Sequence, residues 1–153
     1  GSRVKIKQGS VIEESKIGHE TTVGPYAHLR PGSILGSQVK IGNFVEVKKS
    51  SFKDGAKASH LSYIGDAEIG KDVNLGCGFI TCNYDGVKKH KTVIEDGVFV
   101  GSDSQMVAPV TLGARSYVAS GTTVTKSAPP ESLVISRVKQ VTKEGYAKRF
   151  LKK

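Results

Sequence analysis

The 153-residue chain has the length of one domain, and its apolar runs are shorter than the roughly 20 residues that span a membrane. The net charge of +9 is concentrated in the tail, where seven Lys/Arg and one Glu follow residue 136, and no recognition helix, zinc finger or RNA-binding aromatic motif accompanies it. We therefore expect neither a nucleic-acid nor a membrane partner, and the two cysteines, in no metal-type spacing, favour reduced thiols in a cytoplasmic protein.

A sixfold repeat of apolar residues organises the chain on both sides of its middle. Such a period matches neither an α-helix nor a simple alternating strand. It is the hexapeptide signature of a parallel β-helix, in which one side chain per hexad points inward and three hexads make one triangular coil. The repeat positions are Ile17, Val23, Leu29, Leu35, Ile41 and Val47 in the first run, and Ile94, Val100, Met106, Leu112, Val118 and Val124 in the second.

Two interruptions lie between these runs. The next repeat positions are Lys53 and Ser59, so the period fails there until it resumes at Ile69. From Thr81 to Ile94 there are 13 residues where 12 would keep the register, which predicts a protruding loop. Interruptions of a repeat scaffold usually carry its function, so we expect the site in these two segments.

The repeats end before the Ala-Pro-Pro sequence at 128–130. We expect a repeat domain over residues 1–125 and a basic tail over residues 126–153. Residues 132–136 could form one last strand, against another subunit, while residues 139–153 are weakly amphipathic and leave a helix and disorder both open. Because the chain begins Gly-Ser without Met, we expect it to be cut from a longer protein.

Five motifs occur in a specific order around the interruptions: Leu29-Arg30-Pro31-Gly32 and the segments 42–49, 60–66, 80–86 and 100–103. Together they closely resemble the acetyltransferase half of bacterial bifunctional N-acetylglucosamine-1-phosphate uridyltransferase/glucosamine-1-phosphate N-acetyltransferases, over roughly residues 11–138. The resemblance implies an all-β fold, a left-handed parallel β-helix with a short C-terminal tail, and a homotrimer. It also implies acetyl transfer from acetyl-CoA to glucosamine-1-phosphate in the UDP-N-acetylglucosamine pathway to cell-wall precursors. The N-terminal uridyltransferase domain of that family is absent from this chain, so we expect neither uridyl transfer nor its magnesium site here.

The resemblance further implies roles for individual residues. His60 matches the catalytic base, and no metal is expected. Substrate-binding positions are matched by Arg30, Lys48, Tyr63, Asn74 and Lys89, and acetyl-CoA-binding positions by Cys77, Asn83, Tyr84, Ser102, Ser120 and Arg137. Cys77 and Ser120 stand where the family usually has alanine, so a side-chain role for these two stays open.

The residues themselves support part of this chemistry. A histidine suits a general base because its unperturbed pKa lies near neutrality, although a lone histidine is more often a surface residue. Arg30 and Lys48 lie 18 residues apart, so they should stack about 4.8 Å apart on one face. Two stacked cations without an acidic partner form a plausible phosphate clamp, although solvated surface cations are the commoner outcome. The other histidines, His19, His28 and His90, are interpreted as solvent-exposed turn residues.

Three other functions remain open at this point. The chain could be a hexapeptide acyltransferase for serine or another amino sugar, a zinc-dependent β-helix hydratase, or a non-catalytic scaffold. Arg30, Lys48, Tyr63 and Asn74 favour an anionic sugar phosphate over the first. The hydratase needs about three histidines around one metal, and only His60 and His90 lie near the interruptions. A flat-sided prism has no deep pocket, so a site on its surface also favours an oligomer.

Overall fold

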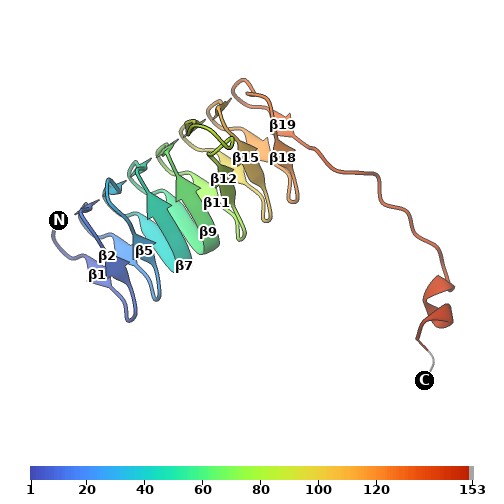
Figure 1. The fold of residues 1–153 in the computed structure, drawn as a ribbon, viewed down its shortest axis with the longest axis horizontal. Coiled ribbons are helices and arrows are strands. Elements are labelled where there is room, and N and C mark those ends of the chain that lie inside the picture. The colour runs from blue at the N-terminus through green and yellow to red at the C-terminus, as the bar shows by residue number, and fades with distance from the viewer. Residues whose placement is uncertain (152–153) are drawn as a thin grey trace.

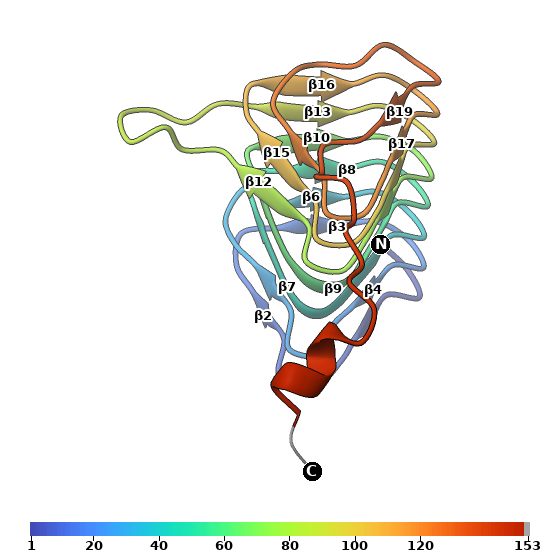
Figure 2. The same cartoon turned by 90° about the vertical axis from the view of Figure 1, so that its right-hand side faces the viewer.

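The computed structural model describes residues 1–151, which form a triangular prism of stacked coils followed by an extended tail (Figure 1). The view along the stack shows three faces (Figure 2). The first face carries β1 (Lys5–Ile6), β4 (Thr22–Val23), β11 (Asn74–Leu75), β14 (Phe99–Val100), β17 (Tyr117–Val118) and β19 (Leu133–Val134). The second carries β2 (Val11–Ile12), β5 (His28–Leu29), β12 (Ile80–Cys82), β15 (Gln105–Val107) and β18 (Thr123–Val124). The third carries β3 (Lys16–Ile17), β6 (Ile34–Leu35), β8 (Ser51–Phe52), β10 (Ala67–Ile69), β13 (Thr92–Ile94) and β16 (Val110–Leu112).

Two longer strands, β7 (Lys40–Lys48) and β9 (Lys57–Gly65), run from the first face to the second without a break. They join the two faces into one 13-stranded parallel sheet, and the third face is a six-stranded parallel sheet, within residues 1–151. We call the edge between the first and second faces corner A, that between the second and third corner B, and that between the third and first corner C. The chain winds as a left-handed parallel β-helix, against the usual right-handed preference of parallel crossovers.

The apolar repeat positions line the interior, as the sequence predicts. Leu29, Ile41, Val100 and Leu112 have no exposed surface, and the whole core is one continuous cluster along the axis. Each fully buried side chain of this kind contributes about 1.5–3 kcal/mol through removal of apolar surface from water. The stack is therefore stabilised along its length rather than at one centre.

The expectation that the repeat fails at Lys53 and Ser59 is wrong. Phe52, Ala58 and Ile64 occupy the interior there, with 2%, 0% and 0% of their surface exposed. The repeat continues one residue earlier because the coil is shorter: Lys40 pairs with Lys57 and Ile34 with Ser51, a step of 17 residues. The shortening falls at corner B. The polar segment that the sequence presents as an interruption is the continuous strand β9.

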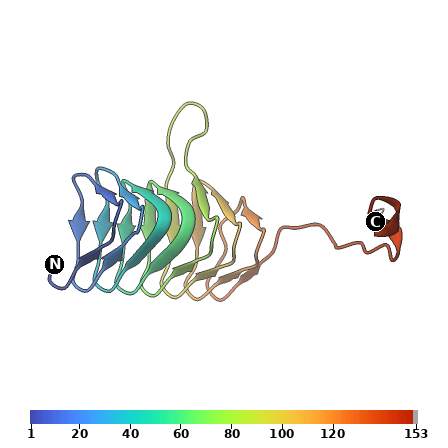
Figure 3. The same cartoon turned by 90° about the horizontal axis from the view of Figure 1, so that it is seen from below.

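The second interruption is confirmed as a protruding loop. Asn74 pairs with Phe99 and Ile80 with Gln105, a step of 25 residues where neighbouring coils have 17 or 18. The additional residues leave corner B between β12 and β13 and extend away from the prism (Figures 2 and 3).

The C-terminal part differs from the expectation in one respect. β19 pairs with β17 of the same chain, Tyr117 with Leu133, so the last strand adds to its own prism rather than to another subunit. The coiled part therefore continues beyond residue 125. The tail then leaves the prism and ends in a short 3-10 helix, η1 (Tyr146–Arg149) (Figure 1). Between residues 1 and 151 there is no helix long and apolar enough to cross a membrane.

Candidate active site

Three cations from separate segments meet at corner B. Arg30 and Lys48 follow β5 and end β7, and the pairing of Leu29 with Val47 places them on adjacent coils, as their spacing predicts. Lys89, from the protruding loop, lies against Lys48. The pKa of the Lys48 ammonium is lowered, first by its contact with the Lys89 amine, then by burial and by repulsion from Lys89 and Arg30. Cations so close together create a local positive potential that suits an anionic ligand.

Arg30 is not the unpaired cation that the sequence predicts. Its Nη1 donates to Glu46 Oε1 at 2.9 Å, and this bond raises the pKa of the Arg30 guanidinium. Glu46 was missed, although it lies two residues before Lys48 on the same strand and therefore faces the same side. The pair occupies Nη1 of the guanidinium and partly offsets the charge of Arg30.

Tyr63 and Asn83 form a polar contact beside the cations. Tyr63 points outward from β9, in register with Glu46. Its Oη accepts from Asn83 Nδ2 at 3.4 Å, and the same amide donates to Asp66 Oδ2 at 2.6 Å. Gly65 makes this arrangement possible, because a Cβ there would overlap the phenol oxygen and would lie 2.7 Å from Asn83 Nδ2. Asp66 was not predicted from the sequence, and it is the carboxylate that opposes the lowering of the Lys48 pKa.

The protruding loop is a closed hairpin. Tyr84 and Lys89 form an antiparallel bridge, and Tyr84 Oη donates to the Gly86 carbonyl at 2.7 Å. Asp85 contacts His90 Nε2 at 2.6 Å, and the His90 side chain is only 21% exposed. The interpretation of His90 as a solvent-exposed turn residue is therefore wrong. His19 and His28 make contacts of their own, with Ser2 and Glu13 respectively.

A second row of predicted residues follows corner A. The pairing of Asn43 with His60 and of Asn74 with Lys57 fixes the register, so that Cys77 lies beside His60 on the next coil. The same ladder continues with Ser102 and Ser120, through the bonds from Asp103 N to Cys77 O (2.7 Å) and from Gly121 N to Ser102 O (2.8 Å). We call His60, Cys77, Ser102 and Ser120 the corner A row. Arg137 extends it, because its Nη1 donates to the Ser120 carbonyl at 3.0 Å.

One chain does not bring all the predicted residues together. Asn74 lies on the first face, in register with Lys57 and Phe99, beyond corner A from the cations. His60 and Gly65 are the two ends of the β9 segment that crosses the second face, a span of at most about 17 Å at 3.3 Å per residue. Tyr63 lies between them. The site is thus a strip across the second face, with His60 at one edge and the cations at the other.

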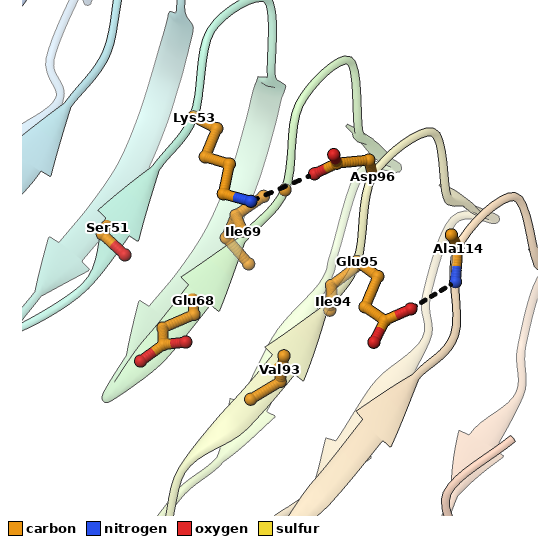
Figure 4. A pocket seen from close by; sticks show the side chains of 10 residues that line it. Ser51, Lys53, Glu68, Ile69, Val93, Ile94, Glu95, Asp96 and Ala114 are labelled. Carbon is orange, nitrogen blue, oxygen red and sulfur yellow. Dashed lines mark hydrogen bonds and ion pairs between the residues drawn. The ribbon is translucent and has the colours of Figure 1, made fainter. Parts of the chain in front are cut away.

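The hollows of the prism lie elsewhere or only border this strip. Figure 4 shows one of about 310 Å³ on the third face, where Lys53 pairs with Asp96 at 3.5 Å and Glu95 accepts from the Ala114 amide at 2.8 Å. It contains none of the predicted site residues. A second hollow, of about 360 Å³, borders the cations with Asp66 and Lys89. Over residues 1–151 no three His, Cys, Asp or Glu side chains gather in a metal-binding arrangement.

The fold and its repeats define the class of protein. The bacterial transferase hexapeptide (six repeats) family matches residues 14–49 and 91–126, the two periodic runs. The chain is a left-handed β-helix protein of this hexapeptide-repeat class. Solved structures agree in fold: perosamine N-acetyltransferase from Caulobacter crescentus, in complex with CoA and GDP-perosamine, has a TM-score of 0.68 at 22% identity, over 76% of this chain and 53% of that one. The acetyltransferase domain of PglB from Neisseria gonorrhoeae has a TM-score of 0.60 at 20% identity, over 68% and 49%.

Sequence comparison identifies the particular relatives. The chain is 62% identical to bifunctional protein GlmU of Pelobacter propionicus over 153 residues, which are 100% of this chain and 33% of that one. It is 65% identical to GlmU of Trichlorobacter lovleyi, over 94% of this chain and 31% of that one, and 60% identical to GlmU of Staphylococcus haemolyticus, over 97% and 33%. The chain is therefore a homologue of GlmU, which confirms the resemblance stated from the motifs, and it spans about a third of the length of these relatives.

Proposed function

We propose that the chain transfers the acetyl group of acetyl-CoA to the amine of glucosamine-1-phosphate, giving N-acetylglucosamine-1-phosphate. The observation that carries this proposal is the meeting of Arg30, Lys48 and Lys89 at one edge of the strip that begins at His60. An acceptor that carries a phosphate fits this end of the strip, because its phosphate takes the cations. The identity to GlmU supports the same substrate.

The corner A row supports acetyl-CoA as the acetyl donor. An acyl-CoA is long and carries phosphates, and the row ends at the Arg137 guanidinium. Cys77 is flanked by Gly76 and Gly78, which keep side chains away from the backbone there. We propose that acetyl-CoA lies along this row, and that Asn83 and Tyr84, which lie at corner B, contact it from a neighbouring chain of the trimer.

In the proposed reaction His60 acts as the general base. The amine nitrogen attacks the thioester carbonyl carbon, so that a C–N bond forms while the C–S bond breaks. His60 takes the proton that the nitrogen loses and can return it to the sulfur of the departing CoA. General base catalysis of this kind contributes about 10²–10⁴-fold. The ordinary pKa range of histidine lets one side chain accept and return the proton near neutral pH.

A shared site in a homotrimer is part of the proposal. Asn74 and the cations lie on different faces of one prism, so a second chain is needed to bring such residues to one substrate. The exposed strip also needs a wall to exclude water. Light scattering should give about three times the chain mass of 16.3 kDa. An active monomer would contradict the shared site.

One assay tests the reaction. Release of free CoA from acetyl-CoA is measured with glucosamine-1-phosphate, glucosamine-6-phosphate and serine as acceptors. We expect release with glucosamine-1-phosphate to exceed the other two. Preference for serine or another amino sugar would instead favour the alternative, a hexapeptide acyltransferase of different specificity. We propose that this chain performs the acetyl transfer in the cytoplasm.

A further inference from the structure

Asp85 is the centre of the hydrogen bonds that close the protruding loop. Its Oδ1 accepts from the backbone amides of Val87 and Lys88 at 2.8 Å each, and its Oδ2 contacts His90 Nε2 at 2.6 Å. These bonds lower the pKa of the Asp85 carboxyl to about 2, the Lys88 amide having the largest effect, followed by His90 and Val87. The carboxylate is therefore charged at any physiological pH.

The same loop is closed through its backbone. The Asp85 amide donates to the Lys88 carbonyl at 3.1 Å, and the His90 amide donates to the Asn83 carbonyl at 2.8 Å. Lys89 therefore lies between Lys88 and His90 in the chain, and the Asp85 carboxylate binds both of these neighbours. Its backbone position is fixed from both sides, although the loop stands away from the prism (Figure 3).

Lys89 is held where its charge is unfavourable. Its amine lies against that of Lys48, which Arg30 also repels, and like charges in contact repel each other. Asp66 faces Lys48 as well, and Glu46 is already bonded to Arg30. Without a restraint, a lysine on a protruding loop would turn to solvent. The loop closure supplies that restraint before any anion is present.

We propose that Asp85 is a positioning residue that holds Lys89 at the cation cluster, so that the acceptor phosphate meets an assembled site. This inference rests on the proposed function for the identity of the anion. Asp85 does not touch the substrate, and it acts through the backbone of Lys88 and the ring of His90. A preassembled site avoids the cost of ordering the loop during binding.

Kinetics of matched variants test the proposal. Asp85→Ala should raise KM for glucosamine-1-phosphate about tenfold to a hundredfold, the usual worth of a charge-assisted hydrogen bond, with KM for acetyl-CoA unchanged. Asp85→Asn should restore most of the loss, because its amide oxygen can still accept from the two backbone amides. Asp85→Ala combined with Lys89→Ala should be no worse than Lys89→Ala alone, since residues that act through one another are not additive.

Two controls separate positioning from general effects. Asp96 is a carboxylate of the same kind on corner C, accepting from the Lys71 amide at 2.8 Å, and Asp96→Ala should leave both KM values unchanged. Lys88→Ala removes the same charge from the same loop as Lys89→Ala, and its effect should be much smaller. Additive losses in the double variant, or equal losses in both KM values, would overturn the proposal.

A readout independent of catalysis is the pKa of the Lys48 amine, measured by NMR. Asp85→Ala should raise it towards the ordinary lysine value, because Lys89 moves away, and should weaken binding of inorganic phosphate. Asp96→Ala should change neither. If the wild type fails to acetylate glucosamine-1-phosphate, the proposed function is wrong while these two measurements still decide the positioning role. An unchanged Lys48 pKa in Asp85→Ala would refute it.

Discussion

Gly65 offers a substitution that should separate activity from stability. A Cβ at this position would overlap the Tyr63 phenol, lying 2.8 Å from Tyr63 Cζ and 2.7 Å from Asn83 Nδ2, where ordinary contact begins at 3.4 Å. The atoms in the way are the ends of two side chains, those of Tyr63 and of Asn83, which is only 6% exposed. They can move without disturbing the backbone ladder, so Gly65→Ala should fold.

The expected loss of activity follows from these distances. The ring and the amide must each move by at least 0.6–0.7 Å, the difference between those distances and 3.4 Å. Misplacement of positioning groups by about 1 Å can cost about 10²-fold in rate. We therefore expect kcat/KM for Gly65→Ala to fall about tenfold to a hundredfold by the CoA-release assay, with its melting temperature nearly unchanged.

The matched control is Gly70→Ala at corner C. Its Cβ would meet backbone atoms, Asp96 N and Glu95 C, both at 2.5 Å, so the prism itself must shift. Overpacking of this kind costs about 1–3 kcal/mol, and 1 kcal/mol lowers Tm by about 2–4 °C at this size. Gly70→Ala should thus lose stability and keep its kcat/KM at low temperature. Full activity in Gly65→Ala would show that Tyr63 and Asn83 have no part in the site.

Three further predictions concern single groups. His60→Ala should lower turnover about 10²–10⁴-fold without changing acetyl-CoA affinity, and near-normal turnover at neutral pH would exclude it as the base. A maleimide should label Cys77, and saturating acetyl-CoA should slow this labelling. Cys77→Ala should stay active and resist inhibition by maleimide. A labelling rate that acetyl-CoA does not change would show that the cofactor does not bind at this corner. Because the pKa of Lys48 is lowered, Lys48 should lose its charge, and the protein its affinity for phosphate, at a lower pH than an ordinary lysine would allow. Lys89→Ala should move that loss to higher pH. A titration of phosphate binding across the alkaline range in both proteins checks the sign.

The repeat made most of the fold predictable from the sequence. Most inward positions are filled by aliphatic residues, whose size suits the narrow interior, and this regularity is visible without a structure. The shift at Phe52 was not visible in the same way. One residue fewer at corner B displaces the following positions by one, so that Lys53 and Ser59 fall on counted positions while Phe52 and Ala58 occupy the interior. A count with a fixed period cannot detect a change of period.

The site was only partly predictable, because the motifs name residues and not their partners. The stacking of Arg30 on Lys48 follows from their spacing, and the register confirms it. The pairing of Arg30 with Glu46 required the alternation along β7, and the bond between Asp85 and His90 depends on the closure of a loop that no period describes. Partners of this kind lie within a few residues of those that the motifs name. Only the folded path of the backbone shows which of them are in contact.

The direction of the corner A row also constrains how the donor can lie. Residues of adjacent coils are separated by about 4.8 Å, so the three steps from His60 to Ser120 extend about 14 Å along the axis. Arg137 marks one end of this row through its bond to the Ser120 carbonyl, and His60 marks the other. A donor whose phosphates take the Arg137 end must present its thioester towards His60, at the edge of the strip that leads to Lys48.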